Sequence, residues 1–304
     1  MAYSVQPLSC DPAVLDGLSA KLIASHHANN YAGAVRRLNA IRGEFAKLDL
    51  SAAPGFAVGA LKREELIAAN SAFLHELYFD CLGAPGELKI GGLSVAFARD
   101  FGSFAKWRAE FTAIGRSLGG GSGWALCSWS ERESRLVNHW SADHTHLLAG
   151  ATPILALDMY EHAYHMDFGA DAAAYVETFM RNIDWTRANV RYAHALEQST
   201  GELSVGSDVI LRDRDAYEVI DVRRAGAYQA APDQIAGASW KDPETVAQWA
   251  AELPAGKSVV VYCVYGHEVG QSTSAYQRDK GISAKFLTGG IQDWKAAGLP
   301  MQKK

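Results

Sequence analysis

The hydrophobic pattern of this chain changes near residue 200, and no single fold accommodates both patterns. Before the change, apolar residues recur at helical spacing from Leu18 to Leu48 and from Lys62 to Leu82, with few helix breakers. After it, short apolar runs alternate with helical ones. At 304 residues the chain is long enough for two cores, since one domain takes roughly 150 residues.

The polar stretch 198–206 carries glycine and serine and shows no periodicity, so it is the expected linker. It separates a first domain, residues 1–197, from a second domain, residues 207–304.

We expect the first domain to be a helical hairpin followed by a mixed α/β half. A further helical pattern covers residues 101–118, and a glycine run follows it. Two apolar segments, 124–129 and 135–140, then predict a β-hairpin. Residues 154–159 favour a third strand, and 171–197 return to helical spacing.

In the second domain strands alternate with helices, which predicts a parallel sheet covered by helices on both faces. The expected strands are 217–222, 258–264 and 284–287, and the expected helices are 243–253, 269–280 and a short one that Gly289 and Gly290 open.

Composition argues against several classes of partner. The formal net charge is -5, and no Lys/Arg-dense block indicates a nucleic-acid surface. No signal peptide and no run of 18 apolar residues is apparent, so we expect neither secretion nor a membrane span. The four cysteines, Cys10, Cys81, Cys127 and Cys263, form no CxxC pair. Reduced thiols fit a cytoplasmic protein.

Four side chains form a candidate metal site. Asp158 and His162 lie four residues apart just after an apolar run, and His26 and His75 lie on upstream segments with helical spacing. Three imidazoles and one carboxylate suit a redox-active first-row metal and leave a coordination position open. For each histidine taken alone, an ordinary core or surface role is the alternative.

These residues resemble the ligand motifs of the iron/manganese superoxide dismutase family. The matching segments are His26-His27, His75-Glu-Leu-Tyr-Phe-Asp-Cys-Leu82 and Asp158-Met-Tyr-Glu-His-Ala-Tyr164, with further matches at Asn39, 100–104, 121–124 and 182–185. The resemblance implies that superoxide is converted to dioxygen and hydrogen peroxide at one iron or manganese ion. The segment 75–82 favours iron slightly.

The chain departs from this family at the entrance to the metal. The family's entrance His and Tyr would fall on Asn30 and Ala34. Tyr31 is a substitute only on an irregular helix, because on an ideal helix it points elsewhere. The family's Gln that bonds solvent at the metal would fall on Ser71 or within 143–146. We expect His144 to replace it, with His146 as the rival.

The resemblance also implies a homodimer in which each Glu161 bonds the other subunit's ligand, His162. A solvated carboxylate is the alternative for Glu161. Trp124 and Trp185 would wall the site with apolar surface, unless they are plain core residues.

Cys263 ends an apolar strand and precedes a helix, a position where backbone N–H groups favour a thiolate or a persulfide. Residues 219–223, 235–238 and 287–294 resemble the rhodanese domain family. The loop 263–268 has no Arg or Lys to hold thiosulfate, and Glu268 would repel it. We therefore expect Cys263 to carry a persulfide from a thiol donor, or the domain to be a binding module; an inert buried cysteine is the alternative.

The sequence thus predicts a superoxide dismutase fused to a rhodanese-like domain and dimeric through the metal domain. A redox or sulfide sensor is the alternative function, in which catalysis is slow and the metal and Cys263 act as the sensor.

Overall fold

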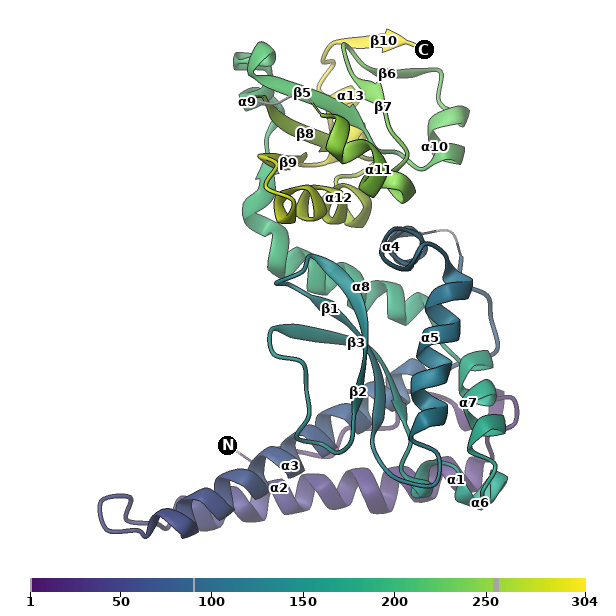
Figure 1. Ribbon diagram of the computed structural model, residues 1–304, viewed down its shortest axis with the longest axis vertical. Coiled ribbons are helices and arrows are strands. Elements are labelled where there is room, and N and C mark those ends of the chain that lie inside the picture. The colour runs from purple at the N-terminus through teal and green to yellow at the C-terminus, as the bar shows by residue number, and fades with distance from the viewer. Residues whose placement is uncertain (1, 90, 254–256) are drawn as a thin grey trace.

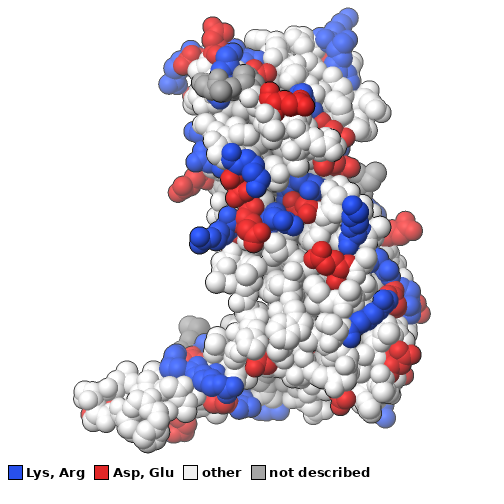
Figure 2. All heavy atoms as spheres, in the orientation of Figure 1, with Lys and Arg blue, Asp and Glu red and all other residues white. Residues whose placement is uncertain are grey.

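The computed structural model describes residues 2–89, 91–253 and 257–304. Its first segment is a helical hairpin whose two long helices lie side by side as an arm that extends away from the body (Figure 1). The elements are α1 (Ala20–Ser25), a π-helix (His26–Tyr31), α2 (Ala32–Phe45) and α3 (Gly55–Cys81). The far end of the arm is largely uncharged in Figure 2, and Leu50 and Phe56 are exposed there.

Two helices follow, of which the pattern predicts only the second. They are α4 (Gly92–Phe101) and α5 (Phe104–Ser117). In α4, Leu93, Val95, Ala96 and Phe97 are all buried, so apolar side chains surround much of the helix instead of marking one stripe. A helix enclosed in this way gives only a weak periodic signal.

The predicted β-hairpin and third strand are confirmed. β1 (Trp124–Ser130) pairs with β2 (Arg135–Ser141) and with β3 (Ala151–Asp158), both antiparallel, in the order β2-β1-β3. The helical pattern over 171–197 is two helices, α7 (Ala172–Arg181) and α8 (Trp185–Thr200). Asp184 is the N-cap of α8, and its carboxylate accepts the Arg187 N–H, so the second helix begins after it. A 3-10 turn (Glu161–Ala163) and α6 (His165–Phe168) precede α7.

The prediction that residues 198–206 have no regular structure is wrong. α8 continues to Thr200, a 3-10 turn covers Gly201–Leu203, and β4 (Ser204–Val205) already pairs with a strand of the second sheet. Polar composition is misleading here because the Thr200 hydroxyl bonds the Leu196 carbonyl within the helix. A domain boundary within 198–206 stays a proposal.

The second domain is built on a five-stranded parallel sheet of order β4-β9-β8-β5-β7. One buried cluster includes Val246, Trp249 and Val269 on one face, and a second includes Ile210, Ile291 and Trp294 on the other. The predicted sheet covered on both faces is confirmed. Its elements are α9 (Ser207–Arg212), a 3-10 turn (Arg214–Ala216), β5 (Tyr217–Asp221), α10 (Ala225–Ala230), β6 (Asp233–Ile235), β7 (Ser239–Trp240), η6 (Pro243–Thr245), α11 (Val246–Trp249), η7 (Ala250–Glu252), β8 (Ser258–Tyr262), α12 (Glu268–Asp279), β9 (Ala284–Leu287), α13 (Gly290–Ala296) and β10 (Met301–Lys303), which pairs with β6.

Among the helices of the described residues, none combines the length and the apolar character needed to cross a bilayer.

Candidate metal centre

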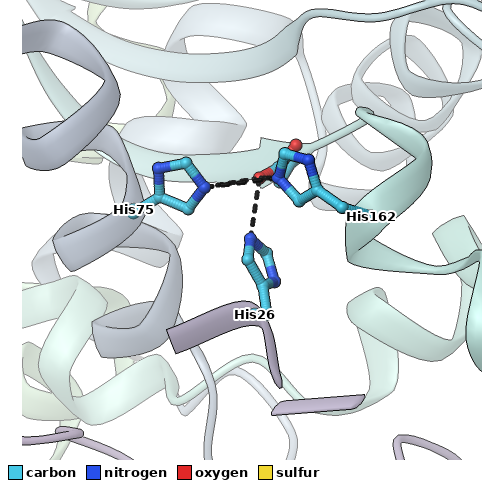
Figure 3. Close-up of side chains that lie close together, drawn as sticks. His26, His75 and His162 are labelled. Atoms are coloured by element: carbon cyan, nitrogen blue, oxygen red, sulfur yellow. Dashed lines mark hydrogen bonds and ion pairs between the residues drawn. The ribbon is translucent and has the colours of Figure 1, made fainter. Parts of the chain in front are cut away.

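The structure brings His26, His75, Asp158 and His162 together. His26 begins the π-helix, His75 lies on α3, Asp158 ends β3, and His162 lies in the 3-10 turn that follows it. One possible ligand atom from each residue lies within 4.8 Å of all the others. Figure 3 shows the three imidazoles pointing toward one centre from three different elements.

The separations between these atoms fit a single ion. Asp158 Oδ2 lies 3.2 Å from His26 Nε2, 3.4 Å from His75 Nε2 and 3.3 Å from His162 Nε2. His75 Nε2 and His162 Nε2 are 3.3 Å apart. Ligand atoms about 2 Å from a common ion are separated by such distances in tetrahedral and related geometries.

The charges of the group also call for a cation. Asp158 is completely buried; its Oδ2 lies against the three histidines, and its Oδ1 accepts the Tyr160 N–H at 2.9 Å. Burial lowers the pKa of His75 to about 3, and burial likewise lowers the pKa of His26. The two imidazoles are therefore neutral, and a buried carboxylate beside them lacks a counter-charge. A divalent or trivalent metal ion would supply it.

The backbone of α3 fixes the orientation of His75. Its Nδ1 lies 2.6 Å from the Ser71 carbonyl, so Nδ1–H donates there and the Nε2 lone pair faces the centre.

The role expected for His144 stays a prediction, but its ring lies beside the four-residue group. Trp124 Nε1–H donates to His144 Nδ1 at 3.0 Å, so His144 carries its proton on Nε2. Its ring stacks on Tyr160 with centroids 4.8 Å apart, and it lies 6.3 Å from the His75 ring. The rival, His146, is exposed and stacks on Trp140 instead.

A cavity of about 440 Å³ opens onto these residues. Its lining includes two of the candidate ligands, His75 and His162. Asn30 and Ala34, the residues expected at the entrance, both line it. The lining residues are Asn29, Asn30, Gly33, Ala34, Arg37, Ile67, Ala68, Ser71, His75, His144, Tyr160 and His162.

The structure does not bring Tyr31 to this cavity, so its assignment to the entrance is wrong. The Tyr31 hydroxyl donates to Glu76 Oε1 at 2.5 Å and accepts the Gln6 N–H at 2.8 Å. Tyr31 could have replaced the family's entrance Tyr only on an irregular helix, and residues 26–31 do form a π-helix. The Tyr31 side chain nevertheless lies on the side of Gln6 and Pro7 in the N-terminal segment.

The two tryptophans differ in position. Trp124 packs edge-on against His75 and bonds His144, so it does wall the site. Trp185 packs among Phe97, Phe104 and Trp107 and is a core residue.

Tyr160 is a site residue that sequence reasoning missed. It stacks on both His144 and His162 and lines the cavity. Burial raises the pKa of its hydroxyl to about 12, so Tyr160 is neutral. The available signal was its place in the motif Asp158-Met-Tyr160-Glu-His162, where the family carries Trp.

Comparison with known proteins agrees with this geometry. Residues 89–191 match the family model described as "Iron/manganese superoxide dismutases, C-terminal domain", and residues 209–297 match the one described as "Rhodanese-like domain". The superoxide dismutase [Fe] of Cupriavidus metallidurans is 61% identical over 196 residues, which are 64% of this chain and 99% of that protein. The chain belongs to the iron/manganese superoxide dismutase family.

More distant members of this family carry either metal in their names. The superoxide dismutase [Mn] 1 of Halobacterium salinarum is 31% identical over 64% of this chain and 98% of its own length. The superoxide dismutase [Fe] of Mycobacterium tuberculosis is 31% identical over 66% of this chain and 97% of its own length. All three relatives match about two thirds of the chain, and the rhodanese-like match lies beyond residue 208.

In the rhodanese-like domain, Cys263 is buried at the end of β8. Burial raises the pKa of its thiol and outweighs the backbone N–H groups of Gly270 and Tyr265, which lower it. The expected N–H groups are present, but the expected net lowering of the pKa is wrong. The Glu268 carboxylate accepts a hydrogen bond from Asn189 of the first domain, and its repulsion of thiosulfate stays a prediction.

Proposed function

We propose that this chain is a superoxide dismutase with an appended rhodanese-like domain. One observation carries the proposal: two imidazoles that burial keeps neutral, a third imidazole and one buried carboxylate face a common centre beside an open cavity. The family membership of the chain supports the same conclusion.

His26, His75, His162 and Asp158 would hold the metal. An iron or manganese ion bound there supplies one-electron redox chemistry, so that one superoxide is oxidised to dioxygen and a second, with two protons, is reduced to hydrogen peroxide. A single carboxylate leaves the site with a net charge near +1 or +2, which keeps both oxidation states accessible. The Ser71 carbonyl orients His75 throughout.

We assign two further roles from position. His144 Nε2–H donates a hydrogen bond toward solvent in the cavity, and Trp124 holds that tautomer through Nδ1. Asn30 and Ala34 line the same cavity, and we assign them to its entrance. We favour iron over manganese, because the relative at 61% identity is named an iron enzyme.

Elemental analysis of the purified protein, followed by reconstitution with each metal, tests the function. We expect bound metal and rapid superoxide removal with iron. If the protein binds each metal but removes superoxide negligibly with either one, the sensor alternative is supported. If it binds neither metal, the dismutase function and the sensor alternative are both refuted.

We also propose a homodimer through the metal domain. Glu161 is exposed beside His162, whose side chain is 27% exposed, so a carboxylate from a second copy can reach that imidazole. We expect Glu161→Ala to weaken dimerisation by at least about tenfold, because the partner imidazole loses its acceptor. Sedimentation velocity measures this, with the exposed Glu131→Ala as the control, and an unchanged dimer in Glu161→Ala contradicts the interface.

For the second domain, we propose that Cys263 accepts sulfur from a low-molecular-weight thiol persulfide. The thiolate attacks the outer sulfur of R–S–S–H, a new S–S bond forms at Cys263, and RS⁻ leaves as the donor's S–S bond breaks. The loop 263–268 offers no Lys or Arg for thiosulfate. Mass spectrometry should detect one added sulfur atom with the persulfide donor and none in Cys263→Ser. Thiocyanate formed from thiosulfate and cyanide at a rapid rate would contradict the choice of donor.

A cytoplasmic location is also proposed, on the support of four free cysteines. Cell fractionation tests it.

A further inference from the structure

The two domains share a buried contact next to the Cys263 loop. α12 of the rhodanese-like domain faces α4 and α8 of the dismutase domain (Figure 1). Val95 of α4 belongs to the same buried cluster as Cys263 and Val269. In the opposite direction, Ala275 of α12 belongs to the core of the dismutase domain. The interface is therefore packed like a protein interior.

Glu268 is held at the centre of this contact. Asn189 on α8 donates from Nδ2 to Glu268 Oε1 at 3.2 Å and accepts the Leu93 N–H on Oδ1 at 3.0 Å. Gly92 at the start of α4 lies against the same side chain, and a Cβ at Gly92 would lie only 2.5 Å from Glu268 Cβ. One residue of the rhodanese-like domain is thus fixed from two helices of the other domain.

The dismutase side of the contact is firmly placed. Arg187 and Arg191 on α8 both bond Asp80 at the end of α3. Arg191 also donates to the Ile154 carbonyl on β3. These bonds tie α8 to α3 and β3, within the dismutase domain.

Glu268 lies close in sequence to the residues that cover the sulfur atom. It is the first residue of α12, and Gly270, two residues later, lies against Cys263 Sγ with a virtual Cβ at 3.6 Å. Cys263 is only 6% exposed, whereas Tyr265 on the other side of the loop is 58% exposed. Keeping α12 in place thus keeps the thiol covered.

We propose that the Asn189–Glu268 contact is a latch by which the dismutase domain holds the loop 263–270 closed over Cys263. The latch makes the reactivity of Cys263 depend on the docking of the two domains. The latch is separate from the dismutase activity, because superoxide removal does not depend on the Asn189–Glu268 contact.

Alkylation of Cys263 by iodoacetamide in the full-length, metal-loaded protein tests the latch, with peptide mass spectrometry to separate Cys263 from the other thiols. We expect Glu268→Ala and Asn189→Ala to raise the rate at Cys263 by about fivefold to tenfold, because one hydrogen bond no longer holds the closed loop. Gly92→Ala should do the same, since its Cβ would displace Glu268. Amide hydrogen exchange over 264–270 should accelerate in these three variants.

Two controls separate the latch from general loosening. Glu268→Gln keeps a carbonyl acceptor for Asn189 and should stay within about twofold of the wild-type rate. Glu252→Ala removes an exposed carboxylate elsewhere in the same domain and should change nothing. Unchanged superoxide removal in every variant shows that the metal domain is folded. The proposal would be overturned if Cys263 were alkylated at the wild-type rate in both Glu268→Ala and Asn189→Ala. It would also be overturned if Glu268→Gln raised the rate as much as Glu268→Ala does.

Discussion

Asp158→Asn should leave a folded protein that holds little metal and has lost its dismutase activity. The carboxylate is the one anionic ligand in the group, and its oxygen lies 3.2 to 3.4 Å from all three imidazole nitrogens. An amide keeps the shape but removes the charge that attracts the ion. We expect metal affinity to fall by at least about 100-fold, with activity falling in proportion.

The same variant also tests what holds the carboxylate in the metal-free protein. Burial acts to raise the pKa of Asp158, but its interactions with His162 and His26 outweigh burial and hold the pKa below its usual range, so the carboxylate form stabilises the fold. Metal-free Asp158→Asn should therefore melt at a lower temperature than metal-free wild type. Elemental analysis and calorimetry of matched samples measure both effects. Full metal content in the variant, or a higher melting temperature without metal, would contradict this account of the site.

His144→Ala should retain its metal and lose about 100-fold in dismutase rate. His144 contributes no ligand atom to the four-residue group, but it lines the cavity, and the bond from Trp124 to Nδ1 leaves its proton on Nε2 as the proposed donor. Removing one oriented donor from an enclosed site costs a factor of about 10² to 10³ in other enzymes. Pulse radiolysis gives the rate, and elemental analysis confirms that the metal remains.

Two variants sharpen this prediction. His146→Ala removes the exposed neighbour and should leave the rate unchanged. Trp124→Phe keeps the apolar wall but removes the bond that fixes the His144 tautomer, and we expect a smaller loss of about tenfold together with a shifted reduction potential. If His144→Ala kept full activity, solvent at the metal would have another partner.

The metal group could be anticipated because its members are marked by type, order and spacing. Asp158 ends a strand that its apolar run reveals, and His162 lies in the turn that follows it. His26 and His75 lie on segments that the sequence predicts to be helical, and His75 does lie on α3. Tyr160 and Trp124 could not be ranked in the same way, because an aromatic side chain in a core and one beside a metal have the same local sequence. Only the stacking on His144 separates them.

Tyr31 and α4 show two other limits. The π-helix at His26–Tyr31 arises from packing between distant segments, so the direction of Tyr31 depends on Gln6 and Glu76 and not on its own spacing. α4 is enclosed by two domains, and a sequence read one domain at a time gives no reason for Val95 to be apolar. Both errors come from contacts that local patterns do not encode.

The join between α8 and β4 leaves almost no slack in the chain. Three residues separate Thr200 from Ser204, so even a fully extended chain would span only about 14 Å between them. Leu203 among them packs against the cores on both sides. A swinging motion of one half relative to the other would have to break these contacts. Peroxide released at the metal therefore reaches the neighbourhood of Cys263 across a fixed separation, by diffusion through water and not by delivery on a moving arm.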